Sequence, residues 1–326
     1  MKILAVDDDA FIRELLPMVL ASKGFQDITV AASGVAALEL IGVAEPAFDC
    51  LLLDIHMPEM DGIELCTRVR QLSAYRRTPI IMLTAMTERR FVDAAFAAGA
   101  TDYVTKPFET MELGIRVRNA EELITARRAA SETTTSAPLA AKLMSAANKP
   151  DLSEVQIEGV SGLVDYPSLR NYLKQLSRSG LLGSQIVAIK VENIEKIHGR
   201  ASAEELTYAL TDIAEAIADT LRGQGLLIAN AGGGLFICVS SAPHMVDPSN
   251  LESEIQSLLD EKQSAYDDGT PMDIDVSVGI PIRPGSHTSS DPDEVLDRAI
   301  ARAESRAQVK QKPCLRLNIR RPGGLP

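Results

Sequence analysis

The stretch Cys50-Leu51-Leu52-Leu53-Asp54 places a carboxylate directly after a short apolar run. Similar apolar runs recur along the N-terminal part of the chain, and stretches with a helical period, such as Phe11–Ser22, Gly62–Gln71 and Arg90–Ala98, lie between them. Strands that alternate with helices predict a doubly wound, five-stranded parallel sheet, which is an α/β fold. The predicted strands are Ile3–Val6, Ile28–Ala31, Cys50–Leu53, Ile80–Leu83 and Tyr103–Val104.

Polar side chains follow these strands at their carboxyl ends, the edge where functional residues gather in a parallel α/β sheet. They are Asp7 and Asp8, Asp54, Thr84, and Lys106. Three crowded carboxylates repel one another, so the pattern favours a divalent cation among them, and all-oxygen ligation suits Mg²⁺. One carboxylate is then a nucleophile toward a phosphoryl donor, while a lysine and a hydroxyl neutralise the transferred oxygens.

A simpler interpretation exists for each residue taken alone. Asp7 and Asp8 are able to cap the following helix, and Asp54, Thr84 and Lys106 are ordinary residues for turns and loops. Polar groups of the right kind at every relevant strand end are harder to explain as a coincidence. We therefore predict one site made by all of these residues.

The motifs around the predicted site resemble those of response-regulator receiver domains over about residues 1–125. They are Val6-Asp7-Asp8, Leu53-Asp54-Ile55-His56-Met57-Pro58 with Asp61-Gly62, Leu83-Thr84-Ala85, and Tyr103-Val104-Thr105-Lys106-Pro107-Phe108. The resemblance implies a flavodoxin-like fold with Asp54 as the phosphoacceptor. It also implies Mg²⁺ held by Asp8, Asp54, the backbone carbonyl of His56 and, through water, Asp7. We expect the His56 ring itself to face solvent.

The same resemblance implies a switch. Thr84 and Lys106 would bind the phosphoryl oxygens, and Tyr103 would move inward as Thr84 is drawn toward them, with the small Ala85 leaving room. The phosphodonor would be a histidine kinase, a phosphotransfer protein or a small molecule.

A face for dimerisation is also expected. It comprises the helix at 90–98, the strand at 103–104 and the helix from Glu109. Asp102, Arg116 and Arg118 lie on this face, and in receivers such charges often pair across a symmetric homodimer. The alternative is that they are solvated surface charges.

A second domain is predicted after a change in composition. We divide the chain into a receiver at 1–128, a linker at 129–154, a second domain at 155–315 and a basic tail at 316–326. Two strands, Leu226–Asn230 and Leu235–Ser240, flank three glycines, which predicts an antiparallel hairpin in an α+β domain. After Val309 we expect an edge strand and then a frayed end.

The second domain resembles a diguanylate cyclase (GGDEF) domain in the order and spacing of its elements. The residues concerned are Val160-Ser161-Gly162-Leu163, Val187–Val191 with Ile197-His198, the hairpin, Val276-Ser277-Val278-Gly279, and Ala299–Ala303. Cyclisation of GTP needs carboxylates that hold metal ions. Lys190 stands where the family has a metal-binding Asp, and the G-G-D/E-E-F signature reads Gly232-Gly233-Gly234-Leu235-Phe236.

Positions that would contact the substrate also depart from the family. The guanine-reading Asn and Asp correspond to His198 and Thr207, and two phosphate-binding lysines correspond to Glu195 and Glu304, which would repel a triphosphate. We therefore expect a degenerate, catalytically inactive domain that signals by binding an unknown protein partner. The alternatives are an active cyclase that makes cyclic di-GMP and a nucleotide sensor without turnover.

Composition narrows the functional classes. The chain has 45 acidic and 33 basic residues, a net charge of −12, which argues against a broad nucleic-acid or anionic-membrane surface. The scattered cysteines (Cys50, Cys66, Cys238, Cys314) indicate reduced thiols. No apolar run approaches the roughly 18 residues of a membrane span, and Met1 opens directly into a strand pattern without a signal peptide. We expect a cytoplasmic phosphoprotein of a two-component system.

Overall fold

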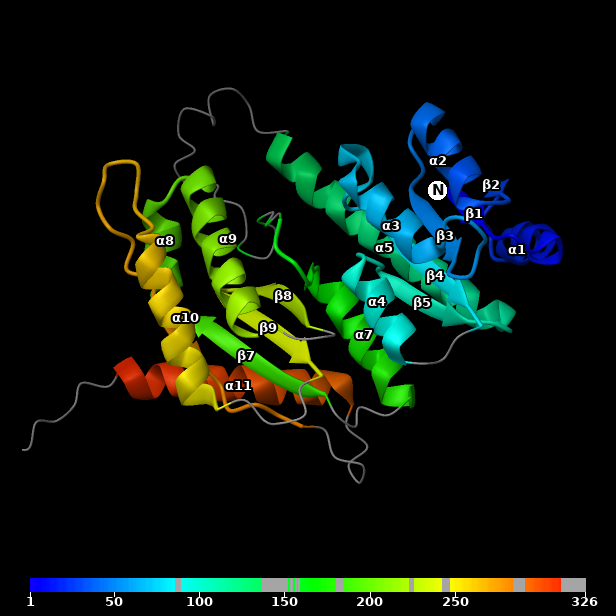
Figure 1. The fold of residues 1–326 in the computed structure, drawn as a ribbon. Coiled ribbons are helices and arrows are strands. Elements are labelled where there is room, and N and C mark those ends of the chain that lie inside the picture. The colour runs from blue at the N-terminus through cyan, green and yellow to red at the C-terminus, as the bar shows by residue number, and fades with distance from the viewer. Residues whose placement is uncertain are drawn as a thin grey trace, which may run out of the picture.

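Two five-stranded β-sheets, each with its own helices, form the protein (Figure 1). The computed structural model describes residues 1–85, 89–135, 152, 155, 157, 159–179, 184–222, 226–241, 247–283 and 291–311. Most of the predicted linker and all of the predicted tail at 316–326 lie outside the described residues.

The first sheet is entirely parallel, with the strand order β2-β1-β3-β4-β5. Its strands are β1 (Lys2–Val6), β2 (Asp27–Ala31), β3 (Cys50–Asp54), β4 (Ile80–Thr84) and β5 (Asp102–Thr105). Every residue of β3 and β4 is buried, as expected for the central strands of a sheet covered on both faces. The predicted doubly wound parallel sheet is confirmed.

Helices cover both faces of the first sheet. They are α1 (Ala10–Ser22), α2 (Gly34–Val43), α3 (Gly62–Gln71), α4 (Arg89–Ala97) and α5 (Thr110–Thr135), with a short 3₁₀ turn at Ser73–Tyr75. Alternate strand residues divide between two apolar clusters because successive side chains point to opposite faces. Ile3 packs in the cluster of α1 and α5, whereas Leu4 packs in the cluster of α2, α3 and α4.

The second sheet has the order β10-β7-β9-β8-β6, and all its neighbours are antiparallel except β6 and β8. Its strands are β6 (Leu163–Val164), β7 (Gln185–Val191), β8 (Leu227–Gly232), β9 (Leu235–Ser240) and β10 (Val276–Val278). Gly232, Gly233 and Gly234 have φ values of 84°, 55° and 71°, so the turn uses the left-handed conformation that glycine tolerates best. The predicted hairpin is confirmed.

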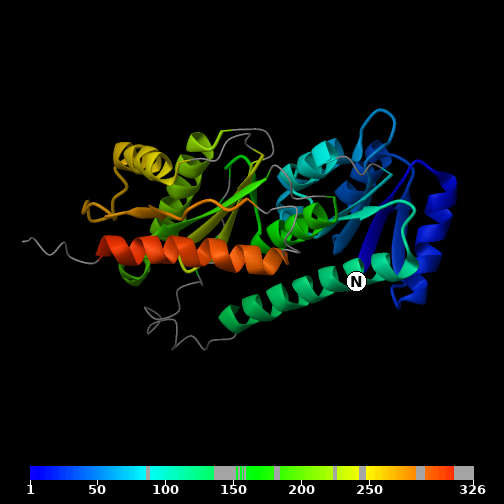
Figure 2. The same ribbon diagram turned by 90° about the horizontal axis from the view of Figure 1, so that it is seen from below.

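Helices flank this second sheet (Figure 2). They are α7 (Tyr166–Ser179), α8 (Ile194–Arg200), α9 (Ala203–Thr220), α10 (Pro248–Lys262) and α11 (Pro292–Gln311). Helices α9 and α10 pack on each other, while α11 runs beside β7 and β10. The second domain therefore combines a mixed sheet with helices, in agreement with the expected α+β class.

Two helices extend past the boundaries drawn from the sequence. Helix α5 continues to Thr135, through the first residues of the predicted linker, and no glycine or proline occurs between Ile115 and Thr135. Helix α11 continues to Gln311, two residues past Val309, and the edge strand predicted for the tail falls on residues outside those that the structure describes. Lys310 binds the backbone carbonyl of Val276 and the carboxylate of Glu192, which ties this last helical turn to the sheet.

Candidate functional site

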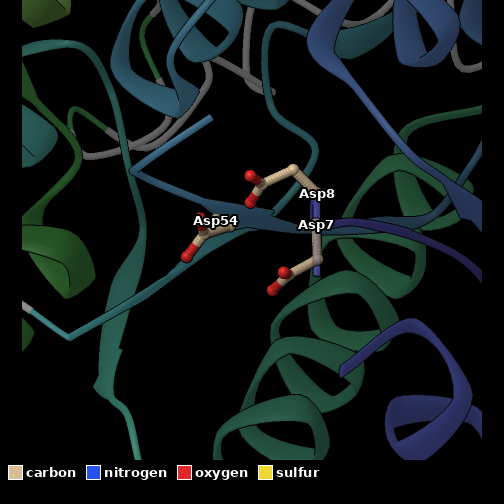
Figure 3. Close-up of side chains that lie close together, drawn as sticks. All are labelled: Asp7, Asp8 and Asp54. Carbon is tan, nitrogen blue, oxygen red and sulfur yellow. The ribbon is translucent and has the colours of Figure 1, made fainter. Parts of the chain in front are cut away.

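Three carboxylates meet at the carboxyl edge of the first sheet (Figure 3). Asp7 and Asp8 follow β1, and Asp54 ends β3; one ligand atom from each lies within 4.8 Å of the others. Asp7 and Asp54 are buried and Asp8 is exposed. Because all the donors are carboxylate oxygens, the group fits a hard divalent cation such as Mg²⁺.

Lys106 supplies a positive charge between two of these carboxylates. Its Nζ lies 2.6 Å from Asp7 Oδ2 and 2.7 Å from Asp54 Oδ1. The lysine follows β5, and its backbone N–H donates a 2.6 Å hydrogen bond to the carbonyl of Thr84, the last residue of β4. The structure thus joins the ends of β1, β3, β4 and β5 at one place, as the sequence predicted.

Burial and neighbouring charges act in opposite directions on the pKa values of Asp54 and Lys106. Burial raises the pKa of Asp54 above its ordinary value, and the charges of Asp7 and Asp8 raise it further, while Lys106 acts in the opposite direction. Burial alone would lower the pKa of Lys106, but its bonds to Asp54 and Asp7 outweigh burial and raise it. Additional positive charge from a cation would relieve the repulsion among the carboxylates.

The predicted switch residues surround the same edge. Thr84 is fully buried, Ala85 is exposed, and Tyr103 in β5 is 2% exposed. The Tyr103 ring belongs to the apolar cluster that contains Phe96 of α4. His56 is exposed, as predicted for its side chain, and its ring meets Phe91 edge-on at 5.5 Å.

Sequence reasoning missed one residue that shapes the site, Arg13, and gave no physical role to another, Gly62. Arg13 Nη1 donates to the backbone carbonyls of Asp7 and Asp8 at 2.9 and 2.8 Å, which fixes the turn after β1. Gly62 approaches so closely that a Cβ would lie 2.1 Å from the carbonyl oxygen of Asp54. The available signal for Arg13 was its place on the first turn of the helix that follows the two aspartates, whereas Gly62 is part of the Asp61-Gly62 motif.

The charges predicted to face a second copy pair within one chain. Arg116 Nη1 lies 3.1 Å from Asp102 Oδ2, and Asp102 is only 3% exposed. Arg118 donates to the backbone carbonyl of Lys23 at 3.3 Å. The structure accordingly supports neither a pairing of these residues across a dimer nor full solvation of Asp102.

The second sheet brings Lys190 to the glycine turn. Lys190 lies opposite Leu235 in the β7–β9 register, and its ammonium group donates a hydrogen bond to the carbonyl of Gly233. Gly234 has φ +71°, and a Cβ there would lie 2.8 Å from the Ile194 side chain. A positive charge therefore stands at the turn, and the turn itself leaves little room for an acidic residue at 234.

The other positions of the second domain that depart from the cyclase pattern are exposed on helices, buried in the core or bonded within their own helix. Glu195 on α8 and Glu304 on α11 are exposed, Phe236 is buried, and His198 is partly buried. The Thr207 hydroxyl donates to the Ala203 carbonyl within α9. Glu192, directly after β7, is neutralised by Lys310 at 3.1 Å and accepts a hydrogen bond from Ser277.

Comparison with known proteins identifies the first domain. A family model for the response regulator receiver domain matches residues 3–118. Residues 3–118 are a response regulator receiver domain. This domain is the one that response regulators of two-component systems contain.

Individual relatives match the same part of the chain. The transcriptional regulatory protein SrrA of Staphylococcus aureus is 44% identical over 117 residues, which are 36% of this chain and 46% of that protein. The chain therefore spans less than half of the length of this relative. Two solved structures are similar to the same part of the chain. The receiver domain of the Francisella response regulator 1452 has 35% sequence identity and a TM-score of 0.34, and the match covers 37% of this chain and 96% of that chain. The Vibrio cholerae chemotaxis protein CheY4 has 36% identity and a TM-score of 0.35, and the match covers 36% of this chain and 97% of that chain.

Among the helices that the structure describes, none has both the length and the apolar character needed to cross a bilayer.

Proposed function

We propose that Asp54 accepts a phosphoryl group from a histidine kinase or phosphotransfer protein, and that the protein is a cytoplasmic response regulator that signals through protein contacts. The observation that carries this proposal is the cluster of Asp7, Asp8 and Asp54 with Lys106 at 2.7 Å, inside a receiver domain. A buried carboxylate beside a lysine is suited to attack phosphorus, because the lysine compensates the charge that arrives.

Asp54, Lys106 and Thr84 would carry out the transfer of the phosphoryl group. A carboxylate oxygen of Asp54 bonds to phosphorus, and the phosphorus–nitrogen bond of a phosphohistidine donor that is protonated on its other ring nitrogen breaks. The electron pair leaves with the ring, which departs as a neutral imidazole. Lys106 and the Thr84 hydroxyl bind the transferred oxygens. Asp8, Asp54, the His56 carbonyl and, through water, Asp7 would hold Mg²⁺, which neutralises charge on the phosphoryl oxygens when it is bound.

The test uses the full chain and a small phosphodonor such as acetyl phosphate with Mg²⁺. Separation on a phosphate-affinity gel should give a shifted band that Asp54→Asn abolishes. Asp61→Asn is the matched control, because Asp61 is also an acidic residue in this motif but caps helix α3 through Glu64 N. Phosphorylation of the Asp54→Asn variant to the wild-type level would refute the assignment.

For the second domain we infer a degenerate GGDEF-like fold without cyclase activity. Two observations at the glycine turn support the loss of activity. The ammonium group of Lys190 donates to the carbonyl of Gly233, and Gly234 and Leu235 stand where the G-G-D/E-E-F signature has its two acidic residues. A phosphorylated sample incubated with GTP and Mg²⁺ or Mn²⁺ should yield no cyclic di-GMP above a control without protein. Product above that control would establish the rival function of an active cyclase, and calorimetric heat with either nucleotide would favour a sensor.

Phosphorylation-dependent homodimerisation belongs to the same proposal. The face expected for it contains α4, β5 and α5 of the receiver domain. Helix α7 of the second domain packs on α4 and β5 and so covers part of that face. A symmetric dimer on this face would therefore require a rearrangement.

A further inference from the structure

Arg13 reaches back from the first turn of helix α1 to the two acidic residues that precede the helix. Its Nη1 donates to the backbone carbonyl of Asp7 at 2.9 Å and to that of Asp8 at 2.8 Å. Within the part of the chain that the structure describes, its guanidinium group forms no ion pair with a carboxylate. Arg13 therefore binds the backbone that presents the two acids, and not their charged groups.

The start of α1 does not explain an arginine at this place. The N-terminus of a helix carries the positive end of the helix dipole, where acidic side chains are stabilising and basic ones are not. Asp9 already caps α1, because its side chain accepts a 2.8 Å hydrogen bond from the backbone N–H of Phe11. The position of Arg13 thus indicates a role outside the helix.

The carboxylate of Asp7 is held in place without Arg13. Its Oδ1 accepts a 3.0 Å hydrogen bond from the backbone N–H of Asp9, and its Oδ2 lies 2.6 Å from Lys106 Nζ. Asp7 is also fully buried, so the packing around it restricts the side chain further. Both oxygens of this carboxylate are oriented by groups other than the guanidinium.

The carboxylate of Asp8 has no such support. The Asp8 side chain is exposed, and among the described residues none forms a hydrogen bond or an ion pair with its carboxylate. Figure 3 shows this carboxylate turned toward Asp54 from the end of β1. Its direction is accordingly set by the backbone of Asp8, and the hydrogen bond that holds the backbone carbonyl of this residue comes from Arg13.

We propose that Arg13 is a positioning residue for the metal site, which directs the Asp8 carboxylate toward Mg²⁺ by holding the backbone of Asp7 and Asp8. This inference rests on the proposed function, in which Asp8 and Asp54 would hold Mg²⁺. It adds a residue that touches neither the metal nor the phosphoryl group and acts through the orientation of a ligand. Groups that orient a ligand contribute to metal affinity although they do not bind the metal themselves.

Two effects of Arg13 on a bound cation have opposite signs. Its positive charge lies beside the acidic pair and opposes the cation, so loss of the charge alone would strengthen Mg²⁺ binding. Its two bonds to the backbone orient Asp8, so loss of those bonds would weaken Mg²⁺ binding. The substitution Arg13→Lys separates the two effects, because it keeps the positive charge and replaces the planar guanidinium with a single flexible ammonium group.

The first experiment is isothermal titration calorimetry of the full, unphosphorylated chain with Mg²⁺. Arg13→Lys should weaken binding about tenfold, which is the contribution expected of a group that orients a metal ligand. Arg13→Gln should weaken it as well, although the opposing charge is gone. Arg118→Lys is the matched control and should leave the affinity unchanged, because Arg118 also donates to a backbone carbonyl of the receiver domain, that of Lys23, at 3.3 Å.

Wild-type affinity in Arg13→Lys would overturn the proposal, and so would tighter binding in Arg13→Gln, since Arg13 would then act only as a charge that opposes the cation. If Arg13→Gln does not fold, Arg13→Lys decides the matter alone.

The rate of phosphorylation by acetyl phosphate, measured over a series of Mg²⁺ concentrations, gives a readout that a general loss of stability would not produce. Arg13→Lys should need about tenfold more Mg²⁺ to reach half of its maximal rate. At saturating Mg²⁺ it should reach the wild-type rate, because Asp54, Lys106 and Thr84 are unchanged. A lower maximal rate with an unchanged Mg²⁺ requirement would mean a general distortion of the site and would contradict the positioning role.

The two experiments also tell failure of this inference apart from failure of the proposed function. If wild type is not phosphorylated on Asp54 but Arg13→Lys weakens Mg²⁺ binding, the positioning role stands and the proposed function falls. If wild type is phosphorylated on Asp54 and Arg13→Lys binds Mg²⁺ as wild type does, the proposed function stands and the positioning role falls.

Discussion

The hydroxyl of Tyr172 donates a 2.7 Å hydrogen bond to Asp93, and this bond joins the second domain to helix α4 of the receiver domain. Asp93 also lies 3.5 Å from Arg89, so its carboxylate has a charged neighbour as well as a neutral donor. The two domains therefore share both an apolar cluster and a polar contact at the surface next to β5. Their stabilities should be coupled.

Replacing Tyr172 with Phe should lower the stability of the coupled state by about 1–2 kcal/mol, because a hydrogen bond to a charged acceptor is lost while the ring remains. Urea unfolding followed by circular dichroism would measure the change. Tyr208→Phe is the control, since Tyr208 is 71% exposed on α9. An equal effect of the two substitutions would show that the Tyr172–Asp93 bond contributes nothing specific.

Replacing Gln175 of α7 with Glu should change self-association, because the 3.0 Å hydrogen bond that Gln175 Nε2 donates to the carbonyl of Tyr103 in β5 is lost. If a symmetric dimer uses the α4–β5–α5 face, α7 blocks it, so the variant should dimerise without beryllofluoride whereas wild type should require it. Analytical ultracentrifugation at several concentrations distinguishes the two states. A variant that stays monomeric at every concentration would show that the α4–β5–α5 face does not bind a second copy.

Lys106→Met should strengthen binding of Mg²⁺ about tenfold, because a positive charge that contacts Asp7 and Asp54 no longer opposes the cation. The same substitution should reduce phosphorylation of Asp54, since the transferred oxygens lose a partner. Isothermal titration calorimetry measures the first effect. Lys196→Met, an exposed position on α8, should leave the affinity unchanged.

Gly62→Ala and Gly42→Ala should have opposite effects on stability. A Cβ at Gly62 would lie 2.1 Å from the Asp54 carbonyl oxygen, so the receiver domain should lose several kcal/mol and its acceptor should be displaced. At Gly42, in α2, nothing lies within 4 Å of the new Cβ, and the helix should gain about 1 kcal/mol. Thermal unfolding of both variants tests the pair, and a stable Gly62→Ala protein would contradict the steric account.

The receiver site could be predicted because a parallel sheet brings strand ends together. Once the strands were assigned from their apolar runs, Asp7, Asp54 and Lys106 had to converge on one edge, and the structure places them within 2.7 Å contacts. Arg13 was missed because its role is to bind backbone carbonyls, which leaves no residue pattern. The fold of the first sheet was predictable for the same local reasons.

The contact between the domains was not predictable from local patterns. Asn171 and Gln175 are ordinary polar residues of an amphipathic helix, and their partners are backbone carbonyls of β5 that any sequence would supply. The pairing of Arg116 with Asp102 likewise depends on how α5 lies against β5. Charges and amides acquire such partners only when the tertiary packing is known.

The buried cysteines offer a separate measure of stability in each domain. Burial raises the pKa of the Cys50 thiol to about 12 and that of Cys66 to about 11, and it also raises the pKa of Cys238 in β9. The reactive thiolate is therefore scarce in the folded protein near neutral pH, so alkylation of all three should be slow until the chain opens.

A Cys314→Ser background removes the fourth cysteine, which lies outside the described residues. In pulsed alkylation across a urea series, Cys50 and Cys66 would report on the receiver domain and Cys238 on the second domain. If the α7 contact couples the domains, wild type should label all three at the same urea concentration, and Tyr172→Phe should separate the two transitions. Rapid labelling without urea would contradict the burial of these thiols. Separate transitions in wild type would mean that the contact through α7 is too weak to couple the domains.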